Sequence, residues 1–443
     1  MPQRRRPIHR TKILTVALFL LAILFAGALT SCGTTGREAA PPPSPGPTAT
    51  LTVPVEMPIT IALTGSFSDE VLNVLDQQIS AFEAENPDIK VAVLRAPRGE
   101  ARRHEAFTEQ LRSGDTTSDI YAVDPPWLPE FYAEGWLVPL DDYADRYSIE
   151  IADFFPPAAE ASSLDGTLVA LPLLLDGGLL YYRQDLLHRY GYEPPLDWRQ
   201  VQEAALAIKE GEGLPVGFVW QGAPYGSLTC NALEYIWAYG GQVLDVHGSP
   251  VFDSVETRAG LQQMVDLVES GASPPEVAAY AERETLADFQ EGNAALMRHW
   301  ASVWPYLEVG ESLSVDQVGI APLPASCLGG LQLALSTHSL HPEQASRFMA
   351  FLVSPAQQVQ LALGANQLPA LNTVYQDARL VAEKPALAHL RDALDPARLR
   401  PISPAYAQIS EAIYTEVNAM LLGTQDVATT AANIQRRLEI SVR

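Results

Sequence analysis

The chain has 443 residues, with 53 Asp and Glu against 29 Lys and Arg, and a formal net charge of −24. This balance disfavours nucleic acids and anionic lipid surfaces as partners, because both attract proteins mainly through Lys and Arg. About 385 residues follow the first 57, too many for one hydrophobic core and enough for two lobes.

Residues 1–31 have the composition of an export signal. An apolar run from Ile13 to Leu29 follows a basic start, and the segment has no acidic residue. Its five basic residues are Arg4, Arg5, Arg6, Arg10 and Lys12. Their removal would leave a net charge of about −29. An uncleaved transmembrane helix is the alternative, which an apolar run of this length only marginally permits.

The residues from Leu29 to Cys32 resemble a bacterial lipobox. The resemblance implies cleavage before Cys32, diacylglycerol on its sulfur, and a mature protein anchored to the outer face of the cell membrane, in a periplasm or at the cell surface. Residues 32–57 are rich in Pro, Thr, Ala and Gly and lack periodicity. They predict an extended, semi-stiff spacer, and the folded part is expected to begin near Pro58.

The folded part opens with alternating strands and helices. A buried strand over 58–65 precedes a helix whose apolar residues recur at helical spacing, with Ser68 as a candidate N-cap. A strand over 88–95, a helix over 99–113 and a strand over 118–123 follow. This βαβαβ order predicts a parallel sheet covered by helices.

Residues 170–182 form an apolar run broken only by Asp176, Gly177 and Gly178. Such a break suggests a strand that leaves one lobe and enters the next. Further helices are expected over 198–210, 228–239 and 255–270, and strands over 217–220, 294–299 and 317–321. From His341 onward the pattern is mostly helical, with a helix opening at His341, Pro342 and Glu343.

The motifs of metal sites and common catalytic sites are missing from the sequence. There is no CxxC, HExxH, GxSxG or P-loop lysine motif, and no GxGxxG follows the first strand. We therefore expect no metal, no cofactor and no enzymatic activity. Cys230 and Cys327 can form a disulfide in an exported protein, but the sequence leaves their distance open.

Three stretches, taken in order, carry a family resemblance: residues 162–205, residues 291–306 (EGNAALMRHWASVWPY) and residues 328–358. They resemble the extracellular solute-binding proteins, family 1, of ABC sugar importers, and the resemblance runs from about Pro58 to the C-terminus. Residues 217–241 and the motif DGGLLYYR at 176–183 are most similar to the trehalose/maltose-binding branch.

The resemblance implies a two-lobe periplasmic-binding-protein fold of the type II kind, with each lobe a mainly parallel α/β sheet flanked by helices and the ligand cleft between the lobes. The expected N-terminal lobe comprises residues 58–172 and 324–375, and the C-terminal lobe residues 173–323 and 376–443. The implied partners are a small sugar and the membrane permease subunits of the importer. A monomer is expected.

A sugar site needs aromatic plates for the C–H faces of a pyranose and charged or amide groups for its hydroxyls. Trp300 matches the stacking tryptophan that follows a Gly-x-Ala-x-Met-type strand in the family; a core tryptophan is the alternative. Trp304 is a second candidate, unless it packs with Pro305 at a helix start.

Two aspartates are further candidates for the cleft. Asp176 sits where the family places a sugar-binding carboxylate, with a turn aspartate as the alternative. Asp124 follows the third strand, at the carboxyl end where α/β sheets present ligands, with a helix N-cap as the alternative. Trp127 lies shortly after it and can reach the cleft.

The remaining candidates come from the resemblance alone. Tyr225 matches an aromatic position of the C-terminal lobe, with Gln221 as a polar companion, and Gly330 resembles a glycine whose backbone approaches the sugar. Arg298, Glu100 and Asn231 complete the set, with surface or capping roles as their alternatives.

The chain departs from the branch at two places. Gly329, Gly330 and Leu331 stand where Gly-Gly-Trp is usual, and Pro369, Ala370 and Leu371 stand where an Arg often follows Pro-Thr. The expected function is capture of a disaccharide or small oligosaccharide by lobe closure. The alternatives are another solute on the same fold, such as a polyol, glycerophosphodiester or peptide, or a surface carbohydrate-active enzyme.

Overall fold

A parallel three-stranded sheet opens the folded part. The computed structural model describes residues 57–308 and 313–442, so the signal, the spacer and Cys32 lie outside the described residues. The first elements are β1 (Ile59–Gly65), α1 (Asp69–Glu85), β2 (Ile89–Arg95), α2 (Glu100–Ser113) and β3 (Ile120–Val123). β1 pairs in parallel with both β2 and β3, as the βαβαβ pattern predicted. The Ser68 hydroxyl accepts from the Val71 N–H at 3.3 Å, so the predicted N-cap is confirmed.

One long strand, β6 (Leu171–Arg183), passes through both lobes. Up to Gly177 it pairs antiparallel with β10 (Ser326–Leu335), and from Gly178 onward it pairs with β8 (Ala294–Trp300) and β9 (Val318–Pro322). The expected break at 176–178 is therefore an exchange of partners within an unbroken strand. We call the part with β1–β3 the first lobe and the part with β7–β9 the second.

The strand order in the main sheet is β2-β1-β3-β10-β6-β8-β7. In the second lobe β7 (Val216–Val219) is parallel to β8, whereas β8 and β9 both run antiparallel to β6. The pairing there is mixed, not mainly parallel as expected. The reason is that β6 runs from the first lobe into the second, whereas β9 and β10 run alongside β6 in the opposite direction.

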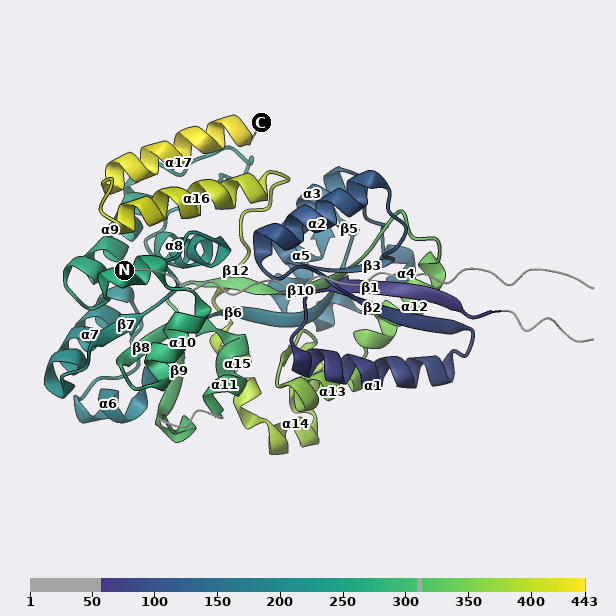
Figure 1. The fold of residues 1–443 in the computed structure, drawn as a ribbon, viewed down its shortest axis with the longest axis horizontal. Coiled ribbons are helices and arrows are strands. Elements are labelled where there is room, and N and C mark those ends of the chain that lie inside the picture. The colour runs from purple at the N-terminus through teal and green to yellow at the C-terminus, as the bar shows by residue number, and fades with distance from the viewer. Residues whose placement is uncertain (1–56, 309–312, 443) are drawn as a thin grey trace, which may run out of the picture. The chain divides into compact units, whose positions relative to one another are not determined.

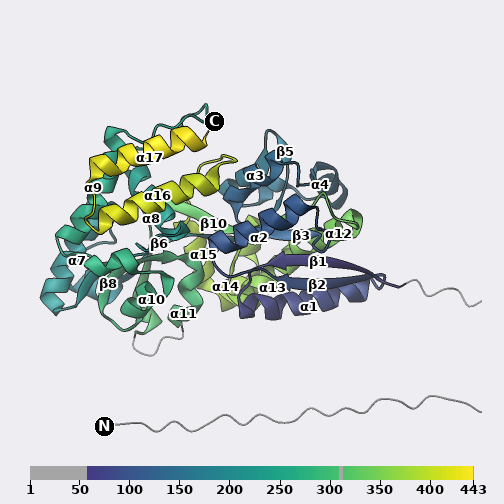
Figure 2. The ribbon, with the colours of Figure 1, turned by 45° about the horizontal axis from the view of Figure 1, so that its top comes forward.

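Helices flank the sheet in both lobes (Figures 1 and 2). The last two, α16 (Tyr406–Leu421) and α17 (Val427–Ser441), pack on α8 (Gly226–Ala238) and α9 (Val255–Glu269) of the second lobe. The predicted helix at His341 is confirmed as α12 (Pro342–Leu352), and α13 (Pro355–Ala365) packs on α1. No helix within residues 57–308 and 313–442 has the length and apolarity needed to cross a membrane.

Shorter elements complete the two lobes. The other helices are α3 (Leu128–Ala133), α4 (Asp141–Tyr147), α5 (Pro156–Ala161), α6 (Gln184–Arg189), α7 (Trp198–Glu212), α10 (Glu282–Gln290), α11 (Trp304–Glu308), α14 (Ala378–Glu383) and α15 (Pro385–Ala393). The other strands are β4 (Ser163–Leu164), β5 (Thr167–Leu168), β11 (Leu368–Pro369) and β12 (Ala397–Arg398).

The second lobe has its own apolar core, which includes Trp198, Trp220, Ile236 and Ile413. Burial of the apolar faces of the helices in this core is the main contribution to their stability, because isolated helices are only marginally stable in water. A disulfide joins Cys230 of α8 to Cys327 of β10, which settles the pairing that the sequence left open.

Candidate ligand-binding cleft

A cleft of about 470 Å³ is lined by segments from both lobes. Its size falls within the range of about 300–1,000 Å³ that is usual for small-molecule sites. The first lobe contributes the β1–α1 loop, the start of α2 and the end of β3; the second contributes the starts of α8 and α10 and the end of β8. The middle of β6 and of β10 supplies the floor.

Six of the predicted site residues line this cleft: Trp300, Asp176, Asp124, Tyr225, Gly330 and Glu100. Five do not: Trp127, Trp304, Gln221, Arg298 and Asn231.

Trp300 ends β8 and is held on several sides. Its indole N–H donates to Glu282 Oε1 at 3.2 Å, and its backbone N–H donates to Nδ1 of His299 at 2.9 Å. A Cβ at Gly329 would lie 3.3 Å from the Trp300 ring, so the glycine allows close packing there. The ring is only partly buried, which leaves it available as an apolar wall of the cleft.

Arg298 lies behind Trp300, and its guanidinium carbon is 4.3 Å from the ring centroid. It is fully buried and pairs with Glu234 of α8 through contacts of 2.9 and 2.5 Å. Gln221 accepts from Arg298 at 3.0 Å, and the Asn231 amide donates to Gln221 at 3.2 Å. All three of these predicted ligand residues are fully buried, and Arg298 and Asn231 both donate to Gln221, so they support the cleft from the core and do not line it.

The two other tryptophans also belong to the core. Trp127 is 2 % exposed and packs against Phe107 and Phe131, because the short turn Pro125–Trp127 directs it inward. Trp304 is 7 % exposed, and its indole N–H donates to Glu308 at 2.9 Å.

Asp176 lies in the middle of β6 and lines the cleft. Its Oδ1 accepts from the backbone N–H groups of Gly177 at 2.9 Å and Ser302 at 3.1 Å. Burial raises the pKa of this carboxyl above its ordinary value, while the bonds from Ser302 and Gly177 oppose that shift. Backbone N–H groups of β6 and of the turn after β8 hold this side chain in place. Asp176 itself lies within a strand and not in a turn, the alternative that the sequence left open.

Asp124 joins two arginines in the cleft wall. Its Oδ1 accepts from Arg400 at 2.6 Å and its Oδ2 from Arg103 at 3.3 Å, and its side chain caps no helix. Arg400 also lies 3.7 Å from Glu100. Burial alone would lower the pKa of Arg400, but Tyr406, Asp124 and Glu100 raise it, so its charge is firmly held.

Glu100, at the start of α2 in the first lobe, reaches Gly226, the first residue of α8 in the second lobe. A Cβ at Gly226 would overlap the carboxylate at the end of the Glu100 side chain, so any larger residue there would require Glu100 to move. Burial and the neighbouring Asp124 raise the pKa of Glu100, while Arg400 and Arg103 oppose the shift.

Glu282 gathers three donors at the far side of the cleft. Tyr225 donates to Oε2 at 2.6 Å and Ser227 to Oε1 at 2.5 Å, beside the Trp300 indole N–H. Although burial would raise the pKa of Glu282, the bonds from Ser227 and Tyr225 lower it, so the group stays a carboxylate. Tyr225, an expected ligand residue, thus lines the cleft with its hydroxyl already bonded.

Gly330 has φ +107°, and a Cβ there would overlap the carbonyl oxygen of Leu174. The register between β6 and β10 shifts between Leu331 and Gln332. A glycine is therefore needed at this bend, where the backbone itself forms part of the cleft surface.

Several residues that line the cleft were not predicted from the sequence: Arg400, Arg103, Glu282, Ser227, Ser302, Tyr306 and Gln367. Arg400 comes after β12 and Glu282 begins α10, where an arginine or an acidic first-turn residue is ordinary. No local pattern distinguishes them, since their position depends on how distant segments meet.

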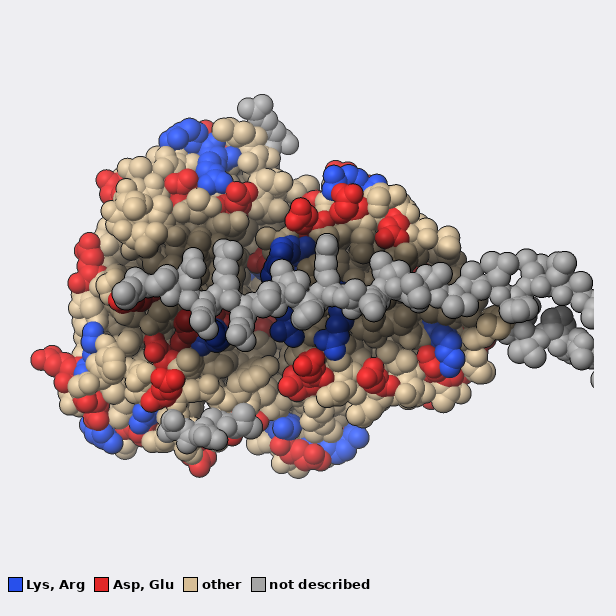
Figure 3. Space-filling model, in the orientation of Figure 1, with Lys and Arg blue, Asp and Glu red and all other residues tan. Residues whose placement is uncertain are grey.

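The residues that line the cleft carry charges of both signs. Four carboxylates, Glu100, Asp124, Asp176 and Glu282, face two guanidinium groups, those of Arg103 and Arg400. Figure 3 shows acidic and basic side chains over the part of one face that the grey atoms leave visible, with several basic side chains near its middle. No cluster of metal-ligating side chains occurs among the residues that the structure describes.

Comparison with known proteins agrees with this architecture. The sequence profile of the bacterial extracellular solute-binding proteins matches residues 68–359. A probable ABC transporter-binding protein of Deinococcus radiodurans is 30 % identical over 347 residues, covering 75 % of this chain and 81 % of that protein. A mannitol-binding protein of Pseudomonas aeruginosa is 24 % identical over 286 residues, which cover 62 % of this chain and 64 % of that protein.

Among solved structures, maltose-bound MalE3 of T. maritima superposes with a TM-score of 0.78 at 35 % identity, covering 86 % of this chain and 99 % of that one. The two-lobe fold class expected from the sequence is thereby confirmed. The matched proteins are solute-binding proteins of ABC transporters, not enzymes. The chain belongs to the bacterial extracellular solute-binding proteins.

Proposed function

We propose that the protein is the solute receptor of an ABC sugar importer and that its cleft takes a disaccharide or small oligosaccharide of the maltose or trehalose kind. The observation that carries the proposal is the position of Trp300, a partly buried aromatic wall flanked by the carboxylates of Asp176 and Glu282. A pyranose offers C–H faces to such a wall and hydroxyls to such acceptors. The similarity to a maltose-bound protein supports the same class of ligand.

The charge of the cleft favours a neutral ligand over a phosphodiester. Arg103 and Arg400 are the only guanidinium groups among the lining residues of the described chain, and both bind Asp124. A phosphate would have to compete with that carboxylate and would face three further ones. A glycerophosphodiester is therefore the weaker candidate, while a polyol differs from a sugar mainly in lacking a ring to stack.

Closure follows from the origin of the lining residues. We propose lobes of residues 58–172 with 324–375 and 173–323 with 376–443, joined by β6 and the returning chain. Glu100 and Asp124 come from the first lobe, Trp300 and Glu282 from the second, so one ligand touches both sets only when the lobes approach. A ligand that binds the closed form better shifts the population toward it.

We further propose how the protein is anchored and where it delivers its solute. Cleavage before Cys32 and its lipidation would anchor the receptor at the outer face of the membrane, with the spacer over 32–57 holding the lobes away from it. There the protein, acting as a monomer, would deliver its solute to the permease subunits of the importer.

Calorimetric titration of residues 57–443 tests the ligand class. The panel is maltose, trehalose, sucrose, maltotriose, glucose, mannitol, glycerophosphocholine and a dipeptide. We expect one neutral sugar to bind tightly and to be recovered unchanged. Trp300→Ala should lose at least about tenfold in affinity, equivalent to about 1.4 kcal/mol, because the stacking wall is gone.

Asp176→Asn, which keeps the size of the side chain but removes its charge, should also weaken binding. Trp136→Phe, in a partly buried tryptophan that does not line the cleft, is the matched control and should bind normally. Binding of glycerophosphocholine or mannitol alone would replace the sugar assignment, and a hydrolysed sugar would contradict the receptor function.

A further inference from the structure

Two hydroxyl groups of the second lobe donate to one carboxylate in the wall of the cleft. The Tyr225 hydroxyl donates to Oε2 of Glu282 at 2.6 Å, and the Ser227 hydroxyl donates to Oε1 at 2.5 Å. The indole N–H of Trp300 donates to Oε1 as well, at 3.2 Å. All four residues line the cleft, so a solute there meets these groups directly. We call Tyr225, Ser227 and Glu282 the Glu282 group.

The protons of the Glu282 group point at its carboxylate. A hydroxyl has one proton and two lone pairs, whereas a carboxylate can only accept. The protons of Tyr225 and Ser227 are therefore used by Glu282, and their oxygens present only lone pairs to the cleft. Although burial would raise the pKa of Glu282, the bonds from Ser227 and Tyr225 lower it, which keeps the carboxylate ionised. Burial and the Glu282 charge raise the pKa of Tyr225, which keeps its proton in place.

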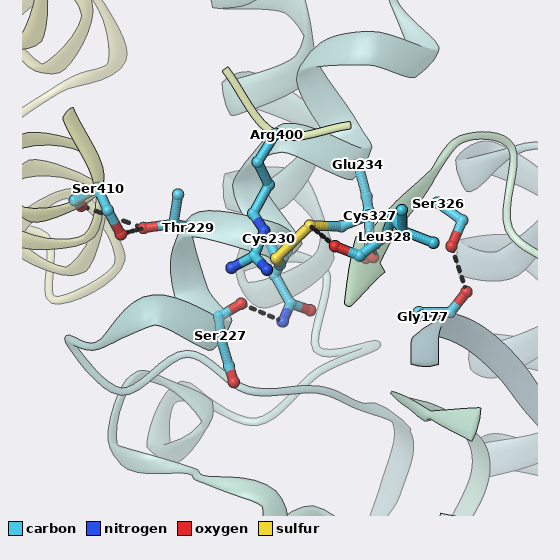
Figure 4. Close-up of a disulfide and its surroundings, with 12 residues drawn as sticks. Gly177, Ser227, Thr229, Cys230, Glu234, Ser326, Cys327, Leu328, Arg400 and Ser410 are labelled. Carbon is cyan, nitrogen blue, oxygen red and sulfur yellow. Dashed lines mark hydrogen bonds between the residues drawn. A yellow bond between two sulfur atoms is a disulfide. The ribbon is translucent and has the colours of Figure 1, made fainter. Parts of the chain in front are cut away.

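Contacts outside the Glu282 group fix the positions of these oxygens. Ser227 is the second residue of α8, and the disulfide from Cys230 of that helix joins it to Cys327 of β10 (Figure 4). Glu282 is the first residue of α10, and its carbonyl oxygen accepts from Nε2 of His299 in β8 at 3.1 Å. Both helices are thereby tied to strands of the sheet, which holds the oxygens of the Glu282 group at a fixed spacing.

We propose that Glu282 sets the direction of the hydrogen bonds at this wall, so that the side chains of the Glu282 group accept hydrogen bonds from the solute and donate none. The inference rests on the proposed function, because it takes a sugar as the solute. It names the kind of sugar: one with free hydroxyl donors on the edge that meets Tyr225, Ser227 and Glu282. Methyl ethers, fluorinated sugars and sugar acids present acceptors at that edge and are selected against.

A missing donor is costly at such a wall. An acceptor on the solute forms no hydrogen bond with the lone pairs of Tyr225 and Ser227, and the Glu282 group then loses the partners that water supplied. For this reason a site built to bond a hydroxyl rejects an analogue without it more strongly than an apolar pocket rejects an extra methylene. Bond direction is therefore an effective basis for selection at this wall.

The first experiment uses the sugar that calorimetry identifies and two analogues at each of its hydroxyls in turn. A deoxy analogue lacks both donor and acceptor, whereas a deoxyfluoro analogue keeps an acceptor and lacks the donor. At the hydroxyl that meets the wall we expect both analogues to lose about tenfold or more in affinity, and to the same extent within about twofold.

Two results of that experiment would overturn the proposal. If fluorine restores the affinity at every position where the deoxy analogue binds weakly, the wall donates hydrogen bonds. If no deoxy analogue binds more weakly than the parent sugar, the wall needs no donor from the solute. Both results come from the natural protein and do not depend on the folding of a variant.

The variant Glu282→Gln assigns the effect to this carboxylate. The amide oxygen is expected beside Ser227 and the Trp300 N–H, which can only donate, so the amide nitrogen faces Tyr225. The Tyr225 hydroxyl must then turn its proton toward the cleft. We expect the penalty of the deoxyfluoro analogue, relative to the parent sugar, to fall about fivefold or more, and the added change Tyr225→Phe to abolish that gain.

Glu276→Gln, at an exposed glutamate that does not line the cleft, is the matched control and should keep the full penalty. An unchanged penalty in Glu282→Gln would show that Glu282 does not set the bond direction, and would overturn the proposal.

If no sugar binds, the proposed function fails, and the direction of the protons is then measured without solute. In residues 57–443 labelled with ¹³C-glutamate, the resonance lost in Glu282→Gln identifies the carboxylate. Its pKa should lie below the usual range of glutamate, because the bonds from Ser227 and Tyr225 outweigh burial, and Tyr225→Phe should raise it. A pKa at or above the usual range would overturn the proposal, since a protonated Glu282 no longer takes both hydroxyl protons.

Discussion

The guanidinium carbon of Arg298 lies 4.3 Å from the centroid of the Trp300 ring, two residues along the same strand. Strand residues two apart point to the same face, so the cation supports the ring that lines the cleft. The pairing of Arg298 with Glu234 fixes that support, and both side chains have no exposed surface.

We predict that Arg298→Met destabilises the protein by about 3–5 kcal/mol, because it leaves the Glu234 carboxylate buried without its cation. The double variant Arg298→Met with Glu234→Leu should recover part of that loss, since it removes both charges. Urea unfolding of the two variants measures the difference. A single variant that costs less than about 1 kcal/mol would show that Glu234 finds another partner.

Gly226→Ala should weaken solute binding roughly tenfold while leaving the free energy of unfolding unchanged or slightly increased. The added Cβ would overlap Glu100 across the cleft, whereas alanine at a helix position is favourable for folding. Calorimetry measures the expected loss of affinity, and thermal unfolding measures whether the stability of the variant is kept.

Two substitutions in α2 test whether Glu100 itself is involved at Gly226. Glu100→Gln should bind more weakly, and Glu105→Gln, at an exposed position of the same helix, is its control. Unchanged affinity in Gly226→Ala would show that the Glu100 side chain moves away at no cost.

Arg400→Met should lower solute affinity about tenfold or more, because Asp124 loses its closest partner and Glu100 a nearby cation. Arg400→Lys should restore only part of the affinity, since a single ammonium group cannot reproduce the contacts of the guanidinium. The exposed Arg398 lies two residues earlier and provides the control Arg398→Met. Equal affinities of Arg400→Met and Arg398→Met would remove Arg400 from the site.

Stability should fall as the pH decreases from 7 to 5 because of His299. Burial lowers its pKa from 6.5 to about 4, although the Glu282 carboxylate opposes the shift. Its Nδ1 accepts from the Trp300 N–H, which requires the neutral ring. The unfolded chain takes up a proton below pH 6.5 while the folded chain does not, so stability is lost as the pH falls from 6.5 toward about 4.

This effect amounts to about 2 kcal/mol between pH 7 and 5. Urea unfolding at both values measures it, above the range in which most carboxyls titrate. His299→Gln should flatten the dependence, and His188→Gln, at an exposed histidine, should not. A slope that survives His299→Gln would mean that another group takes up the proton.

Much of the fold was predictable from local patterns. The βαβαβ start, the Ser68 cap and the helix after His341 follow from periodicity and capping, which depend on neighbouring residues. The family followed from three ordered stretches, and the matched profile confirms it. The mixed pairing of β6 was not predictable, because strand direction depends on where the chain returns.

The site shows the same division. The sequence by itself determined the family, and the resemblance brought Trp300, Asp176 and Gly330 forward; Asp176 also stands out locally as a charge within an apolar run. Only the tertiary structure decided that Arg298 supports the cleft from behind, that Arg400 and Glu282 join it, and that Cys230 meets Cys327. These outcomes depend on which distant side chains share one buried volume, and local periodicity carries no information about that.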